Sequence, residues 1–69
     1  MQLNNFNIFT AKTLEEFKDL EQKLFSVDIE NDTAVTVYCY ETDTFYYYKS
    51  EEILGKLRLV TSGEHKFGE

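Results

Sequence analysis

Several residue types that small proteins use as staples or catalysts are scarce in this chain. Its 69 residues include one Cys, one His and three Gly. One cysteine cannot form a disulfide within the chain, one histidine cannot complete a zinc site, and three scattered glycines make no phosphate-binding loop. A catalytic nucleophile needs a neighbouring base, and the lone His65 lies near the end of the chain. The sequence therefore predicts no catalytic residues, no metal site and no cofactor, and it favours a protein that is not an enzyme.

Basic residues and long apolar runs are also lacking. Seven Lys and Arg stand against thirteen Asp and Glu, which gives a net charge of -6, and such a chain repels the phosphates of nucleic acid. No apolar run approaches the roughly 20 residues of a membrane-spanning helix, and the first ten residues lack the basic start and apolar stretch of a secretory signal. We therefore expect no direct nucleic-acid ligand, no membrane contact and no secretion through a signal peptide.

Hydrophobic residues, by contrast, are plentiful enough for a folded core. They make up 42% of the chain, and aromatic residues alone make up 16%, which is unlike a disordered segment. A chain this short buries only about 60% of its unfolded surface, so it has room for one small domain. We predict a single domain over residues 1–61 and a flexible tail over residues 62–69, which are polar and contain glycine.

The clearest local signal is the start of a helix. The sequence Thr13-Leu14-Glu15-Glu16 matches a capping box, in which the Thr13 hydroxyl accepts from the amide of Glu16 and Glu16 reaches back to the amide of Thr13. The helix is expected to begin at Leu14 and to end near Phe25 or Ser26. Its apolar side chains fall on one side at about 100° per residue. They are Leu14, Phe17, Leu20, Leu24 and Phe25.

Four segments have the composition of strands. Residues 6–10 alternate apolar and polar types, residues 33–40 and 44–48 are dense in β-branched and aromatic types, and residues 56–60 alternate again after a turn at Gly55. The predicted fold class is α+β, with the order strand, helix, strand, strand, strand. We expect an antiparallel sheet of three to four strands with the helix packed on one face.

The two central strands predict a surface rich in tyrosine. A three-residue loop over residues 41–43 would place Cys39 opposite Phe45 and Tyr38 opposite Tyr46. Four tyrosines then share one face of the hairpin, and they are the candidate partner-binding residues. They are Tyr38, Tyr40, Tyr46 and Tyr48. Tyrosine offers large, stiff contact area to a partner, but the same rings could instead form a ladder that the first strand or the tail covers. Cys39, on the opposite face, is expected to be a buried hydrophobic residue.

Acidic residues gather in the same half of the chain. Between Ser26 and Gly55 seven acids face a single base, Lys49, so this segment carries a balance of -6. The seven are Asp28, Glu30, Asp32, Glu41, Asp43, Glu51 and Glu52. Solubility is the simpler explanation. The alternative is that they form the acidic surface of a small inhibitor that binds a basic surface of a host protein, as nucleic-acid mimics do.

The order of these motifs resembles a small module of bacteriophage tail, fibre and minor virion proteins. The resemblance rests on Thr13-Leu14-Glu15-Glu16-Phe17 followed by the hairpin of residues 35–48, with its acidic turn Glu41-Thr42-Asp43. It implies a non-enzymatic structural or assembly protein, in the virion or the host cytoplasm, that binds other virion proteins, often in symmetric copies. A short chain without a disulfide or metal gains stability by burying a second surface, which would also suit a homo-oligomer.

Overall fold

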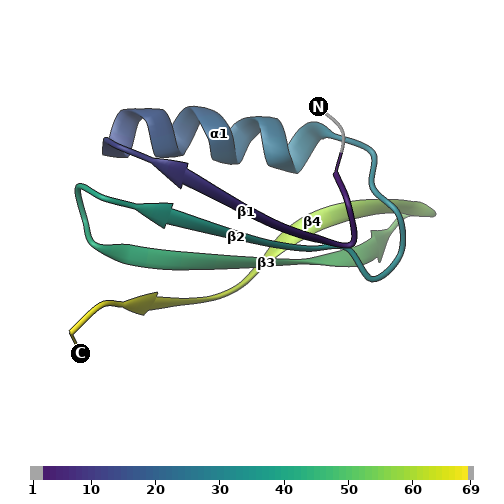
Figure 1. The fold of residues 1–69 in the computed structure, drawn as a ribbon. Helices are drawn as coiled ribbons and strands as arrows, with labels where there is room; N and C mark the ends of the chain where they lie inside the picture. Colours follow the sequence, from purple (N-terminus) through teal and green to yellow (C-terminus); the bar gives the residue numbers. More distant parts are fainter. Residues whose placement is uncertain (1–2, 69) are drawn as a thin grey trace.

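The computed structural model describes residues 3–68 and contains five elements. In chain order they are β1 (Phe6–Ala11), α1 (Leu14–Ser26), β2 (Ala34–Cys39), β3 (Thr44–Ile53) and β4 (Lys56–Lys66) (Figure 1). The predicted α+β class and the order strand, helix, strand, strand, strand are confirmed. Met1 and Gln2, at the start of the predicted domain, and Glu69, at the end of the predicted tail, lie outside the described residues.

The four strands form one mixed sheet, in the order β1-β2-β3-β4. The two pairs β2–β3 and β3–β4 are antiparallel, but β1 is parallel to β2. The prediction of a fully antiparallel sheet is therefore wrong. The reason is α1, which runs back along the sheet and returns the chain to the end where β1 began, as a crossover between parallel strands requires.

The helix begins and ends where the sequence predicts. The Thr13 side chain accepts a hydrogen bond of 3.1 Å from the amide of Glu16, and Leu14 is the first helical residue. The carboxylate of Glu16 reaches one residue further back than predicted, because it accepts from the amide of Lys12 at 2.9 Å. With 13 residues, α1 is short, and no helix within residues 3–68 is long and apolar enough to cross a membrane.

The buried core combines α1 with all four strands. Phe17 and Leu24 of α1 are buried in the same cluster as one or more residues of every strand. The strand residues of the cluster are Ala11, Val35, Val37, Cys39, Tyr48 and Leu59. Cys39 is a free, fully buried thiol, which confirms its prediction as a small core residue.

The pairing between β2 and β3 differs from the predicted register by one residue. Cys39 lies opposite Thr44 and Tyr38 opposite Phe45, so the predicted pairs Cys39–Phe45 and Tyr38–Tyr46 are wrong. A slip of one residue moves every side chain of a strand to the other face. Here it turns Tyr46 toward α1, where its ring stacks on Phe17 with the ring centroids 4.2 Å apart.

The β3–β4 hairpin is longer than the sequence suggests. β3 continues through the polar residues 50–52, and a two-residue turn, Leu54-Gly55, connects it to β4. β4 does not stop at residue 60. It passes an irregular step opposite Tyr47 and Tyr48 and continues to Lys66, which pairs with Thr44. Residues 62–66 are therefore part of the sheet, and the prediction of a tail from residue 62 is wrong for them.

Candidate functional site

One face of the sheet carries α1, and no element described within residues 3–68 covers the other (Figure 1). Side chains alternate between the two faces along each strand, and the buried residues of β1, β2 and β3 mark the face that α1 covers. We call the uncovered side the outer face. Where β1, β2 and β3 pair side by side, its residues are Phe6, Ile8, Thr10, Ala34, Thr36, Tyr38, Phe45, Tyr47 and Lys49.

The outer face is apolar for a surface that meets water. Phe6 is 65% exposed and Ile8 is 63% exposed, both on β1, and Tyr47 of β3 is 36% exposed. The strand register places Ile8 beside Thr36 and Thr36 beside Tyr47, so these side chains form one row across three strands. A contiguous apolar patch of this kind on a small soluble chain is typical of an interaction surface.

Aromatic contacts hold one end of the outer face in place. The ring of Tyr38 lies 4.7 Å from that of Phe45 and 4.8 Å from that of Tyr40, measured between centroids. The hydroxyl of Tyr38 donates a hydrogen bond to the carboxylate of Asp43 in the β2–β3 turn. That hydrogen bond is the main cause that raises the pKa of Tyr38 to about 12. Tyr38 is therefore held in place by two ring contacts and one hydrogen bond.

The four predicted tyrosines do not share a surface. Tyr38 and Tyr40 contact each other at the end of the outer face. Tyr46 stacks on Phe17 and Tyr48 is only 2% exposed, so both lie on the side of α1. The single tyrosine face predicted from the sequence is thus wrong, because it depended on the register that the structure shifts by one residue.

Sequence reasoning missed the residues that complete the outer face. Phe45 and Tyr47 take the places that the predicted register gave to Tyr46 and Tyr48. Phe6 and Ile8 alternate with the buried Asn7, and that alternation in residues 6–8 was a signal for two exposed apolar side chains. Asn7 satisfies its own polar groups, because its side chain accepts from the amide of Asn4 and donates to the carbonyl of Asn4.

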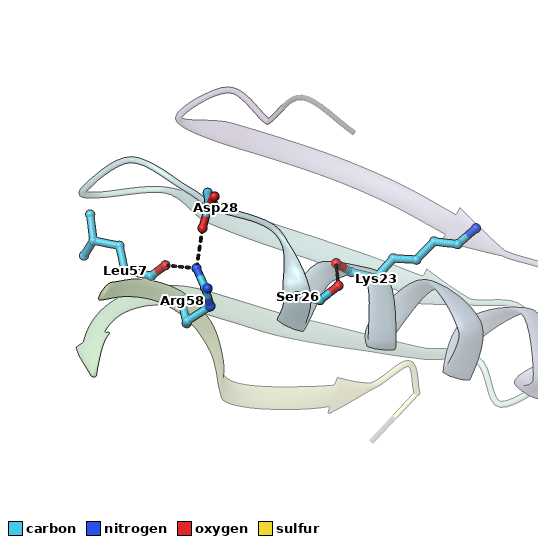
Figure 2. Close-up of polar contacts among 5 residues, drawn as sticks. All are labelled: Lys23, Ser26, Asp28, Leu57 and Arg58. Atoms are coloured by element: carbon cyan, nitrogen blue, oxygen red, sulfur yellow. Dashed lines mark hydrogen bonds and ion pairs between the residues drawn. The ribbon is translucent and has the colours of Figure 1, made fainter. Parts of the chain in front are cut away.

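Three of the seven predicted acidic residues are used in contacts within the chain. Asp28 pairs with Arg58 at 2.6 Å, joining the segment after α1 to β4 (Figure 2). Glu41 accepts from the amide of Leu14 at 3.1 Å, and Asp43 accepts from Tyr38. These side chains connect loop segments to neighbouring elements of the fold. The exposed Asp28–Arg58 pair adds little stability.

The acidic residues also lie at two separate places. Glu41 and Asp43 belong to the β2–β3 turn, whereas Asp28, Glu30 and Asp32 follow α1. Near the latter, an open pocket of about 420 Å³ is lined by residues of the α1–β2 segment and the β3–β4 hairpin, namely Asn31, Ser50, Glu51, Glu52, Gly55 and Leu57. Across the part of the chain that the structure describes, no group of three or more His, Cys, Asp or Glu side chains could hold a metal ion. Glu51 and Glu52 thus lie with Asn31 at this pocket, whereas Glu41 and Asp43 lie in the β2–β3 turn.

Comparisons with protein-family models, with curated proteins and with solved structures find no match to this chain. The surfaces that its own residues build are thus the basis on which a function can be inferred.

Proposed function

We propose that this chain is a non-enzymatic protein that acts by protein–protein contact, and that the outer face is its contact surface. The observation that carries the proposal is the uncovered row of Ile8, Thr36 and Tyr47, flanked by the packed rings of Tyr38 and Phe45. Exposing such side chains to water costs free energy, and a partner that covers them recovers it.

The composition of the outer face indicates the chemistry of its partner. Where β1, β2 and β3 lie side by side, Lys49 carries the one full charge among the nine outer-face residues at neutral pH, although the whole chain carries -6. A partner must therefore offer an apolar or aromatic surface rather than a basic one. Binding of this kind changes little with added salt, whereas capture of a basic partner by the acidic residues would weaken steeply as salt is added.

The resemblance to virion modules supplies a class of partner for this proposal. A structural protein of a phage particle would then be the occupant of the outer face. The Thr13 cap of α1 and the β2–β3 hairpin, which belong to the segments that carry the resemblance, are both formed in the structure. The assembly role and the location in a virion or a host cytoplasm stay part of the proposal.

Photo-crosslinking tests the contact surface. A photoreactive amino acid is placed at Tyr47, and in a separate variant at Ile53, while the protein is made in the cells that naturally produce it. Ile53 is a matched control, because it is 45% exposed on the same strand and the same side of the sheet but about 20 Å from Tyr47, beyond the part of β3 that pairs with β2. We expect a discrete covalent adduct with another protein from Tyr47 and none from Ile53. Adducts from Ile53 alone, or from neither position, would contradict the proposal.

A further inference from the structure

The sheet has two edge strands, β1 and β4, and the backbone groups of β1 that face away from β2 are the subject of this inference. The carbonyl of Asn5 accepts from the amide of Ala34 at 2.8 Å, and the carbonyl of Ala11 accepts from the amide of Tyr40 at 2.9 Å. In a parallel pair every second residue of a strand bonds to its neighbour, so residues 5, 7, 9 and 11 face β2. Phe6, Ile8 and Thr10 therefore point their amides and carbonyls away from the sheet.

This edge lacks the features that usually keep sheet edges from pairing. Residues 3–11 contain no charged residue and no proline, and β1 is regularly paired along its six residues. The opposite edge is different, because β4 carries Lys56, Arg58, Glu64 and Lys66 and is irregular opposite Tyr47 and Tyr48. Charges and bulges are the common protection of an edge strand. One edge of this sheet is thus protected and the other is not.

We propose that β1 pairs antiparallel with β1 of a second copy of this chain. A twofold axis through Ile8 places Ile8 opposite Ile8 of the second copy and Phe6 opposite Thr10 of the second copy. In this register the outward groups of Phe6, Ile8 and Thr10 all find partners, with roughly six hydrogen bonds between the chains. The result is a continuous sheet of two four-stranded halves.

The absence of charge on β1 makes it the edge at which a second copy of this chain can bind. Two chains that each carry -6 repel one another, so they can associate closely only where neither brings charge to the contact. The uncharged β1 meets that condition, whereas like charges opposite one another destabilise a strand pair. Pairing of β1 with itself is also a closed twofold contact, which stops at a dimer because β4, at the far edge of each copy, is protected.

The pairing deepens the proposed function, on which this step rests, because it enlarges the contact surface. A twofold axis perpendicular to the sheet keeps both outer faces on the same side. Phe6 and Ile8 of the two copies then meet at its centre, and Tyr47 lies in each half. The dimer presents one outer face that is twice as wide as that of a single chain.

Hydrogen exchange on the unaltered protein tests the pairing directly. In the monomer no residue within 3–68 accepts from the amides of Phe6, Ile8 and Thr10, while those of Asn7, Phe9 and Ala11 are bonded to β2. We expect exchange of the first three amides to slow as the protein concentration rises, with the other three protected throughout. Added salt should strengthen the effect, because it screens the repulsion between the chains. Fast exchange of Phe6, Ile8 and Thr10 that stays unchanged up to about 1 mM would overturn the proposal.

Two variants separate the edge from the outer face. Thr10→Pro removes an amide that points only to the open edge, and Thr10→Ala removes the same side chain but keeps the amide. By sedimentation we expect Thr10→Pro to weaken the dimer by at least about tenfold and Thr10→Ala to leave it unchanged. Tyr47→Ser should leave the dimer intact. A dimer that Tyr47→Ser breaks and Thr10→Pro does not would show pairing through the outer faces and would overturn the edge contact.

The two proposals can fail separately. A monomeric protein that still crosslinks from position 47 to another protein would end the edge pairing and leave the proposed function standing. A dimer that Thr10→Pro breaks, without any crosslink from position 47, would establish the edge pairing and contradict the proposed function. In the paired sheet the two Tyr47 side chains lie about 24 Å apart, too far to crosslink to each other.

Discussion

The hydroxyl of Tyr48 donates a hydrogen bond of 2.7 Å to the carboxylate of Glu21. This contact joins β3 to α1, and it accounts for an acidic residue that lies among the apolar positions of the helix. Tyr48 can reach Glu21 only when it faces α1, which the observed register of β2 and β3 requires. The pair thus helps to select one of two registers that differ by a single residue.

Removal of the Tyr48 hydroxyl should destabilise the protein. Tyr48→Phe leaves the half-buried carboxylate of Glu21 without its donor, and we expect a loss of about 1–2 kcal/mol in the free energy of unfolding. Denaturant unfolding measures the change, and Tyr47→Phe, which removes an exposed hydroxyl of the outer face, is the matched control. In a double-mutant cycle, Glu21→Leu should remove most of the cost of Tyr48→Phe. Equal losses for Tyr47→Phe and Tyr48→Phe would refute the role of the contact.

Alkaline pH should unfold the protein by ionising the same residue. Burial, followed by the hydrogen bond to Glu21, raises the pKa of Tyr48 above its ordinary value of 10.0. The folded state then holds this proton more tightly than the unfolded state does, so the contribution is complete below pH 10 and falls as the pH rises beyond it. We expect the unfolding free energy to decline above pH 10 by at most about 1.4 kcal/mol per pH unit for this group. Tyr48→Phe should flatten the decline in a denaturant series, and an unchanged slope would contradict the assignment.

The start of α1 should depend on Thr13. Its side chain is the acceptor for the amide of Glu16, so Thr13→Ala is expected to cost about 1 kcal/mol, whereas Thr13→Ser keeps the acceptor and should cost little. Thermal unfolding followed by circular dichroism measures both variants. If Thr13→Ser were as damaging as Thr13→Ala, the methyl group rather than the cap would be responsible.

A substitution in the turn between β3 and β4 should stabilise the protein. Leu54 and Gly55 both have positive φ, 52° and 81°, as in the two-residue turns that favour Asn-Gly. Leu54 is 99% exposed, so its side chain contributes no burial. We expect Leu54→Asn to raise the unfolding free energy by about 1 kcal/mol. Gly55→Ala should lower it, although a Cβ at Gly55 would meet no atom within 4 Å, because the cost lies in the backbone alone. A loss of stability in Leu54→Asn would show that the leucine makes a contact in solution.

The features that the sequence predicts correctly are local. The capping box at Thr13 and the apolar spacing of the helix establish α1, and composition identifies the strands in their order. The direction of β1 was predictable in principle, because a helix between two adjacent strands usually makes them parallel. The register of β2 and β3 was not, since it depends on contacts of Tyr46 and Tyr48 with Phe17 and Glu21, which are 27 or more residues away along the chain.

The outer face could not be predicted from the sequence, because it too depends on the register of β2 and β3. The tyrosine face was a consequence of the predicted register, so an error of one residue exchanged Tyr46 and Tyr48 for Phe45 and Tyr47. The alternation of apolar and polar residues at Phe6, Asn7 and Ile8 can be seen in the sequence. The position of Phe6 beside Ala34 and of Ile8 beside Thr36, however, depends on the crossover through α1. Short stretches of sequence indicate which residue types the strands carry. Which of those residues share one face of the sheet depends on the pairing of all the strands.

The parallel pairing of β1 with β2 also determines the stage of folding at which β1 can join the sheet. Phe6 must find Ala34, a partner separated from it by the whole of α1, while β2, β3 and β4 are joined by short turns and can assemble from neighbours. Closing the larger loop has the greater entropic cost, so the three-stranded meander should form before β1 is captured. During that interval the uncharged strand is exposed along both edges, and crowded nascent chains would be most vulnerable to mispairing there.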